Sequence, residues 1–205
     1  PRNLFGFKDG TNNIKSEDGD AKLNEHLWVQ KGDDSGADWM AGGTYFVVRK
    51  IHMFAEMWDN LRLIEQEQTF GRDKRYGAPL NVTAPTSGKD EFKPIDFKAK
   101  NKEGELEVPA DSHIVIVNSE QNKGRWMLRR GYNYTEGSDA LGRLSAGLFF
   151  IAFVRDPRTN FYPILDKMTQ KDALSEYLQH QARALFAIPA GIGQSDTMVG
   201  QALFS

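Results

Sequence analysis

The chain has 205 residues, no cysteine and a formal net charge of −2 at pH 7. This length suits one large domain or a compact pair with a sizeable apolar core. The lack of cysteine excludes disulfides, thiolate zinc sites, iron–sulfur clusters and cysteine nucleophiles, and the near-neutral charge argues against nucleic acid or an anionic membrane as a partner.

The ends of the chain and its histidines give further expectations. No apolar run approaches the length of a membrane span, and no signal peptide is visible. Because the chain begins with Pro1 rather than methionine, we expect it to be the later part of a longer precursor. Any metal would be bound by carboxylates or by the histidines, which are His26, His52, His113 and His180.

The N-terminal part is predicted to be loops followed by a strand. Gly6 to Gly10 (GFKDG) predicts a tight turn with close backbone approach. Residues 12–41 are rich in Asn, Asp, Lys and Gly, which predicts a long polar excursion. Thr44 to Ile51 (TYFVVRKI) is β-branched and aromatic, so it is predicted to be a strand.

An amphipathic helix against a sheet is predicted from Phe54 to Gln68, because apolar residues such as Met57 and Ile64 recur with a period near 3.6. Gly71 is predicted to cap this helix, which would hold Arg72 on a fixed backbone. A long connection with charged residues then runs to about residue 110.

The stretch from Asp111 to Tyr134 holds the best metal-ligand candidate, His113, at the start of a predicted strand from Ile114 to Val117. A polar connection leads to a predicted returning strand that begins at Trp126. Two arginines, Arg129 and Arg130, follow it. A guanidinium that is removed from water needs an anion beside it. The candidates are a carboxylate, a phosphate, a haem propionate and a peroxide. A core histidine and a structural ion pair would account for the same residues.

The C-terminal part alternates between predicted strands and helices. Leu148 to Val154 is the most apolar run and predicts a central strand that ends at Asp156 and Pro157. The later elements are a helix from Thr159 to Met168, a helix from Ala173 to about Gln181 capped by Asp172, and a strand from Ala184 to Ile188. This order predicts an α+β, ferredoxin-like (split βαβ) domain over residues 1–205, with an antiparallel sheet of about four strands and helices on one face.

Several motifs then give the chain a family resemblance, in the family's own order. They are GFKDGTNN at 6–13, GTYFVVRKIHMFAEMWD at 43–59, FGRDKRYGAPL at 70–80, DSHI at 111–114 and MLRRGYNY at 127–134. On these motifs the chain resembles the C-terminal half of DyP-type (dye-decolourising) haem peroxidases, in the exported EfeB-like deferrochelatase/peroxidase branch. The N-terminal ferredoxin-like domain usual in that family is missing from this chain.

The resemblance implies a catalytic set around a haem b. His113 matches the axial iron ligand, which leaves the opposite face of the haem open for peroxide. Asp9 matches the distal aspartate and Arg129 the distal arginine. Peroxide heterolysis needs a proton moved between its oxygens and positive charge near the leaving oxygen, and these two residues supply them.

Other matches concern the haem edge. Arg72 matches an arginine that holds a propionate. Gly10, Thr11 and Asn12 resemble a backbone cradle, and Asn118 matches an asparagine downstream of the axial histidine. The chain departs from the family pattern at three positions, where it has Val115 in place of arginine, Ser119 in place of proline, and Gly131 in place of the distal asparagine of some branches. Asp172 is the candidate for a carboxylate that orients His113.

The function implied by the resemblance is a haem b peroxidase that reduces hydrogen peroxide and oxidises an organic donor or ferrous iron in bacterial iron or haem uptake. We also expect export through a Tat signal, a homo-oligomer in the full-length form, and iron-uptake membrane components as partners. Two alternatives stay open. One is a haem or iron carrier with incidental peroxidase activity, and the other is a half-domain that cannot hold haem without its missing partner.

Overall fold

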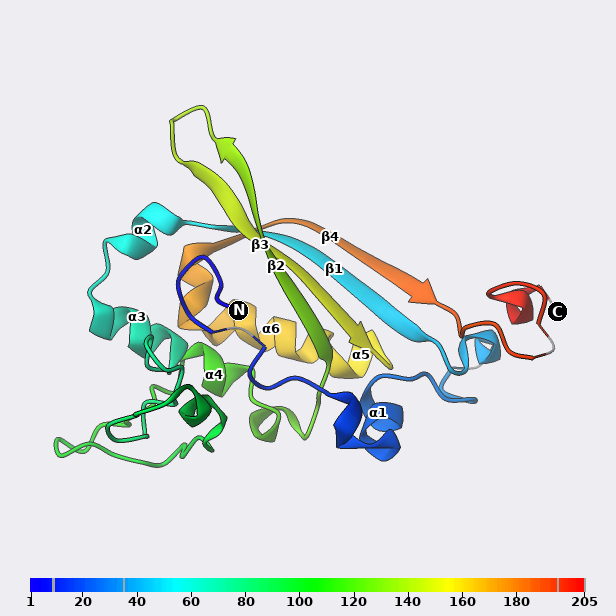
Figure 1. Cartoon of the computed structure of the whole chain (residues 1–205), viewed down its shortest axis with the longest axis horizontal. Coiled ribbons are helices and arrows are strands. Elements are labelled where there is room, and N and C mark those ends of the chain that lie inside the picture. The colour runs from blue at the N-terminus through cyan, green and yellow to red at the C-terminus, as the bar shows by residue number, and fades with distance from the viewer. Residues whose placement is uncertain (9, 35, 195, 205) are drawn as a thin grey trace.

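A computed structural model describes residues 1–8, 10–34, 36–194 and 196–204. Short helices and four long strands alternate along the chain (Figure 1). The α-helices are α1 (Asp20–His26), α2 (Ala55–Asp59), α3 (Leu63–Phe70), α4 (His113–Ile116), α5 (Pro157–Asn160) and α6 (Tyr162–Lys171). The strands are β1 (Thr44–Met53), β2 (Leu128–Ser138), β3 (Leu144–Val154) and β4 (Leu178–Ile188). The 3₁₀ turns are η1 (Ser16–Asp18), η2 (Asp38–Met40), η3 (Gly88–Phe92), η4 (Glu120–Asn122), η5 (Ala173–Tyr177) and η6 (Gln201–Leu203).

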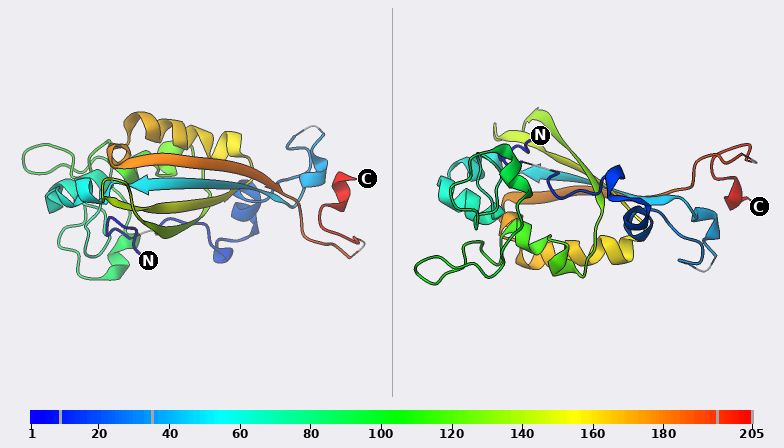
Figure 2. Two further views of the ribbon diagram at one scale, coloured as in Figure 1. Left: turned by 90° about the horizontal axis from the view of Figure 1, so that it is seen from above. Right: turned by 60° about the horizontal axis from the view of Figure 1, so that its bottom comes forward.

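The strands form one antiparallel sheet in the order β2-β3-β1-β4. The chain order is strand, helices, two strands, helices, strand, so the predicted ferredoxin-like α+β fold is confirmed. Helices α3 to α6 lie below the sheet in Figure 1, and the views of Figure 2 show the other face free of described helices. Among the described residues, no helix combines the length and the apolar character needed to cross a membrane.

The strand predicted from Ile114 to Val117 is wrong, because this segment forms the one-turn helix α4. Its first turn is closed by the carbonyl oxygen of Ser112, which accepts from the backbone N–H groups of Val115 and Ile116. A short apolar run has no periodicity that separates a buried helix from a strand. The strand predicted to begin at Trp126 instead begins at Leu128, and it pairs with β3 rather than with residues 114–117.

The helix predicted from Phe54 to Gln68 is divided into α2 and α3. Met57 and Ile64 are more than half exposed, so they do not contribute to the core as predicted. Trp58 and Phe70 take that place and are buried. Gly71 does cap α3, with the left-handed φ of 80° that glycine tolerates best.

The later elements differ from prediction mainly in their limits. The predicted helix at 159–168 is interrupted at Phe161, because Pro163 sits in the first turn of α6 and favours a new helix start there. Asp172 accepts from the backbone N–H of Leu174 at 2.9 Å, as the predicted cap requires. The helix that follows is only η5, and β4 begins at Leu178 instead of Ala184.

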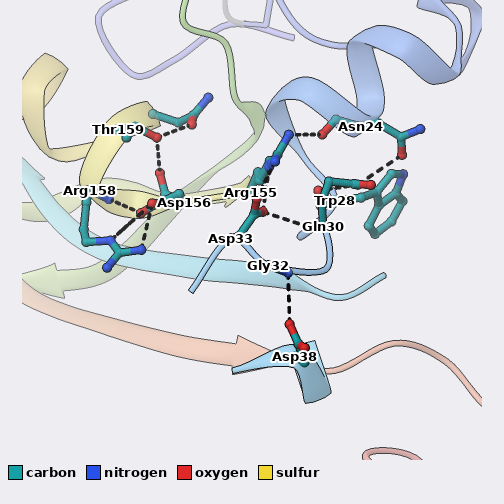
Figure 3. Close-up of polar contacts among 11 residues, drawn as sticks. Asn24, Trp28, Gln30, Gly32, Asp33, Asp38, Arg155, Asp156, Arg158 and Thr159 are labelled. Atoms are coloured by element: carbon teal, nitrogen blue, oxygen red, sulfur yellow. Dashed lines mark hydrogen bonds and ion pairs between the residues drawn. The ribbon is translucent and has the colours of Figure 1, made fainter. Parts of the chain in front are cut away.

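The polar excursion at 12–41 is folded against the end of β3 (Figure 3). Arg155 donates from Nε to Asp33 Oδ2 at 2.7 Å and from Nη1 to the backbone oxygen of Asn24 at 3.1 Å. Asp33 also accepts from the backbone N–H of Gln30 at 2.8 Å. The hydrogen bond from Arg155 lowers the pKa of Asp33, so this carboxylate stays ionised as the anchor of the loop.

The core joins aromatic residues of the N-terminal segment to those of α2 and α3. Trp58 is fully buried and donates from Nε1 to the backbone oxygen of Phe5 at 3.2 Å. The Phe5 ring stacks on Trp58 at 4.4 Å, and the Phe7 ring stacks on Phe70 at 4.0 Å, centroid to centroid. The Phe70 ring in turn lies 6.0 Å from the His113 ring. The N-terminal segment is thereby packed against the helices that carry the site.

Candidate functional site

A pocket opens between the helices and the inner face of the sheet, and its wall comes from segments far apart in the chain. The apolar lining includes Ile51, Leu148, Phe150, Leu165 and Met168. The polar lining includes Lys8, Gly10, Thr11, Asn12, Arg49, Arg72, His113, Asn118, Arg125, Arg129 and His180. No carboxylate stands in this lining among the residues that the structure describes.

His113 is the first residue of α4, and its ring is oriented by a buried carboxylate. Its Nδ1 lies 2.7 Å from Asp172 Oδ2, and the Asp172 side chain is 1% exposed. Asp172 is itself fixed by its bond from the Leu174 N–H. Because Nδ1 is bonded, Nε2 is the ring nitrogen that remains for a ligand in the pocket. The predicted contact between Asp172 and His113 is therefore present.

Arg72 is held by the backbone. Its Nη1 donates to the backbone oxygens of Gly77 at 2.6 Å and Glu91 at 3.0 Å. Burial lowers the pKa of Arg72 to about 10, with the Glu91 charge opposing and the Arg129 charge adding to that effect. A cation that is buried against carbonyls and faces a second cation is stabilised when an anion binds beside it.

Arg129 is joined to the N-terminal loop by a reciprocal pair of hydrogen bonds. The Asn13 Nδ2 donates to the Arg129 backbone oxygen at 2.9 Å, and the Arg129 backbone N–H donates to Asn13 Oδ1 at 2.8 Å. The Arg129 Nη2 also donates to the backbone oxygen of Asn12 at 2.7 Å. The loop is fixed on its other side by Glu91, which accepts from Lys8 Nζ and Thr11 Oγ1, each at 2.9 Å.

The predicted site residues can now be placed. All the described members line this one pocket, and they are Gly10, Thr11, Asn12, Arg72, His113, Asn118 and Arg129. Asn118 uses its Oδ1 to cap the turn that follows α4, accepting from the Glu120 N–H at 2.9 Å. Asp9, the predicted distal carboxylate, lies outside the described residues, so its assignment still rests on the sequence.

Arg49 and His180 line the pocket as well and were not predicted as site residues. Arg49 lies in β1 and is 6% exposed, and its Nη2 lies 2.7 Å from both ring nitrogens of His180 in β4. A signal for Arg49 was available, because a charged residue sits between Val47 and Ile51 on the inward-facing side of a strand. His180 gave no such signal, since it was placed in a helix.

The arrangement can hold an apolar molecule that has an acidic edge and one metal-ligand position. The apolar residues supply its walls, and Arg72 and Arg129 supply charge at one rim. Among the described residues, no group of three or more His, Asp or Glu side chains is arranged to hold a bare metal ion. His113 is therefore suited as a single protein ligand to a metal that brings its other ligands with it.

Comparisons with known proteins agree with this geometry. The family model for the C-terminal part of Dyp-type peroxidases matches residues 1–193. A dye-decolorizing peroxidase of Thermobifida fusca is 37% identical over 191 residues, which are 93% of this chain and 43% of that protein. A deferrochelatase of Escherichia coli K12 is 35% identical over 205 residues, which are 99% of this chain and 46% of that protein.

Solved structures match equally well. The oxyferrous complex of DtpA from Streptomyces lividans superposes with a TM-score of 0.89 at 38% identity, covering 100% of this chain and 53% of that one. A DyP-type peroxidase from Streptomyces coelicolor gives 0.88 at 37% identity, covering 100% and 52%. The chain spans about half the length of these relatives. On the family model and these identities, the chain belongs to the Dyp-type peroxidase family and corresponds to its C-terminal part.

Proposed function

We propose that this chain is the haem-binding half of a haem b peroxidase that reduces hydrogen peroxide and oxidises a donor. The observation that carries the proposal is the orientation of His113. Its Nδ1 is engaged by the buried Asp172 at 2.7 Å, and its ring lines a pocket whose rim carries Arg72 and Arg129. Of the relatives, the Streptomyces lividans protein is described as ferric and oxyferrous, which supports an iron centre here.

The residues present fit haem in three respects. The apolar walls suit the porphyrin face, and the Arg72 guanidinium suits a carboxylate at its edge. The His113–Asp172 pair supplies one neutral imidazole ligand whose basicity is raised by a carboxylate. Arg72 would hold a propionate, and the backbone of Gly10, Thr11 and Asn12 would lie along the same edge.

In the proposed reaction, haem supplies the iron at which peroxide is reduced. Arg129 holds positive charge near the oxygen that becomes anionic, which lowers the barrier to cleavage. Asp9 takes the proton from one peroxide oxygen and returns it to the other, so that water leaves. Asp172 keeps the Nδ1 proton of His113 in place and so fixes the tautomer of the ligand.

The identity of 35% to deferrochelatases favours a second function, in which the protein mainly carries haem or releases its iron. Under either function we propose the same setting. The donor is an organic molecule or ferrous iron, the protein is exported through a Tat signal, and it works in iron uptake with membrane components as a homo-oligomer. Negligible peroxide turnover by the full-length holoprotein would favour the carrier.

The test begins with purified chain titrated with hemin while the Soret band is recorded. We expect one hemin per chain, and we expect His113→Ala to lose the band of the bound form, because its axial ligand is gone. His52→Ala is the matched control, since His52 lies outside the pocket lining and should bind hemin like the parent.

The catalytic residues are tested in the same protein. Asp9→Asn and Arg129→Leu should keep hemin bound but slow the reaction with peroxide by about 100-fold or more, as expected for loss of an acid–base or charge-stabilising group. An unchanged Soret band in His113→Ala would refute the ligand assignment. If the parent chain takes up no hemin, the chain is a half-domain that cannot hold haem without its missing partner.

A further inference from the structure

Arg49 is a buried cation whose partners do not neutralise it. It is 6% exposed, and burial lowers the pKa of Arg49 to about 10, with the Arg183 charge acting in the same direction. Its polar partner is the His180 ring at 2.7 Å. Burial and the Arg49 charge lower the pKa of His180 to about 4, so this partner is neutral at pH 7.

A bulge in β4 places His180 and Arg183 on the same face of the sheet as Arg49. In the pairing of β1 with β4, Arg49 is opposite Arg183 and Ile51 is opposite His180, so Gln181 is the extra residue. Residues directly opposite in a sheet share a face, so His180 and Arg183 both fall on the pocket side. In a regular strand, residues three apart would point to opposite faces.

The Arg49 group is separate from the rim that we assign to haem. Arg129 lies in β2 at one edge of the sheet, whereas His180, the partner of Arg49, lies in β4 at the opposite edge. No described carboxylate forms a salt bridge with Arg49. Since the two carboxylates of haem b stand on one edge of the ring, they occupy one rim and leave Arg49 for another anion.

The surroundings of Arg49 also indicate what kind of molecule would carry the negative charge. Its guanidinium carbon lies 5.9 Å from the centroid of the Phe161 ring. Phe150 and Leu165 line the same pocket, so an apolar or aromatic group can pack beside the charge. β4, which carries His180, is exposed along nearly its whole length. A ligand can therefore reach Arg49 from solvent on this side.

We propose that Arg49 and His180 form a subsite for a carboxylate borne on a small aromatic body, on the β4 side of the pocket and apart from Arg72 and Arg129. The guanidinium donates a forked pair of hydrogen bonds to the carboxylate, and the aromatic body packs against Phe161. The inference rests on the proposed function only where it assigns the other rim to haem.

The experiment uses benzoate as the probe and the haem-free chain, with its histidines labelled for NMR. At pH 6 and constant ionic strength, we expect a saturable shift of the His180 resonances with benzoate and none with benzyl alcohol, its neutral counterpart. Saturation should also raise the pKa of His180 above about 4, because the bound anion stabilises the imidazolium. Both readouts come from the parent chain, so they do not depend on a variant that folds.

Variants then assign the response. Arg49→Gln should weaken benzoate binding about tenfold or more, because it removes a charged hydrogen-bond donor. Lys50→Gln is the matched control, since Lys50 lies on the opposite face of β1 with Glu136 at 2.5 Å, and it should bind benzoate like the parent. No saturable shift in the parent, or an equal affinity in Arg49→Gln, would overturn the subsite.

Calorimetry on the hemin-loaded chain distinguishes the two sources of carboxylate. Benzoate binding that persists after loading supports a ligand separate from haem, and its loss would show that a haem carboxylate occupies Arg49, which overturns that separation. Failure to load hemin would count against the proposed function, while the titration of the haem-free chain would still decide the subsite.

Discussion

At the scale of single residues, the site depends on how Asp172 divides its two oxygens. Oδ1 accepts from the Leu174 N–H at 2.9 Å and starts η5, whereas Oδ2 bonds the His113 ring at 2.7 Å. One carboxylate thus links the end of α6 to the first residue of α4. The same group serves the fold and the proposed ligand.

Asp172→Asn separates these two duties. An asparagine keeps an oxygen for the cap but removes the negative charge beside His113, so the fold should remain. We expect hemin affinity to fall about 10- to 100-fold and the reduction potential of the bound iron to rise, because the imidazole becomes a weaker electron donor. Asp166→Asn, on the exposed side of α6, is the control. Unchanged affinity and potential in a spectroelectrochemical titration would contradict this role.

Sequence motifs located part of the pocket. His113, Arg72 and Arg129 come from motifs that the structure brings to one pocket, although their roles remain predictions. The pairing of Arg49 with His180 was missed for a physical reason. Their meeting depends on the bulge at Gln181, and the position of a bulge is set by pairing with β1, which leaves no local pattern in β4.

At the scale of elements, the end of α3 packs closely against the residues that flank His113 at the start of α4. Gly71 has a φ of +80° at the end of α3. A Cβ on Gly71 would lie 2.7 Å from Ile114 Cγ1 and 2.7 Å from Ser112 Oγ, the residues on either side of His113. Glycine is required here both by the backbone and by the close approach of the next helix.

Gly71→Ala is therefore expected to destabilise the domain by two effects. The left-handed backbone costs about 1–2 kcal/mol, and the overpacking against α4 adds about 1–3 kcal/mol. Gly104→Ala is the matched control, because Gly104 has a φ of +85° and nothing within 4 Å of its added Cβ. Urea denaturation measures both free energies of unfolding. Equal losses in the two variants would show that the contact with α4 carries no energy.

The elements also show where pattern reasoning fails. Strand β1 was predictable because β-branched and aromatic residues predominate in TYFVVRKI. Helix α4 was not predictable, since its four residues, HIVI, are strand formers by composition. They are helical because the Ser112 carbonyl closes the turn and because Ile114 and Ile116 are buried there. Tertiary packing decided this element.

At the scale of the whole molecule, the sheet has two unequal faces. The inner face carries the pocket, and no described helix lies over the outer face (Figure 2). Aromatic side chains gather on that outer face, where the Phe46 ring lies 5.0 Å from Phe153 and 5.9 Å from Phe186. Phe186 is 51% exposed and Tyr132 is 57% exposed. An apolar face of this kind favours association with another surface.

Phe186→Lys should make the isolated chain more soluble without changing its fold. We expect weaker binding of the dye ANS and less self-association in sedimentation, with the free energy of unfolding altered by no more than about 0.5 kcal/mol. Leu141→Lys is the control, because Leu141 is 76% exposed in the turn between β2 and β3 and not on this face. Identical ANS binding in parent and Phe186→Lys would show that the outer face is not the adhesive surface.

The overall topology was the most predictable level. The order of strands and helices along the chain specifies a split βαβ sheet even where individual limits are wrong, because few connections satisfy that order. The uncovered outer face was not predictable from this chain, since its aromatic residues have the same pattern as a buried core.

The side-chain amide of Asn13 has a wider consequence. It takes the place of a neighbouring strand for the first residues of β2, since it both donates to and accepts from the backbone of Arg129. If the N-terminal loop moved away, the backbone N–H and carbonyl oxygen of Arg129 would lose their hydrogen-bond partners together. The hydrogen bond from Arg129 Nη2 to Asn12 would break at the same time. We therefore expect the N-terminal loop to detach from β2 in one step, because its hydrogen bonds to Arg129 break together.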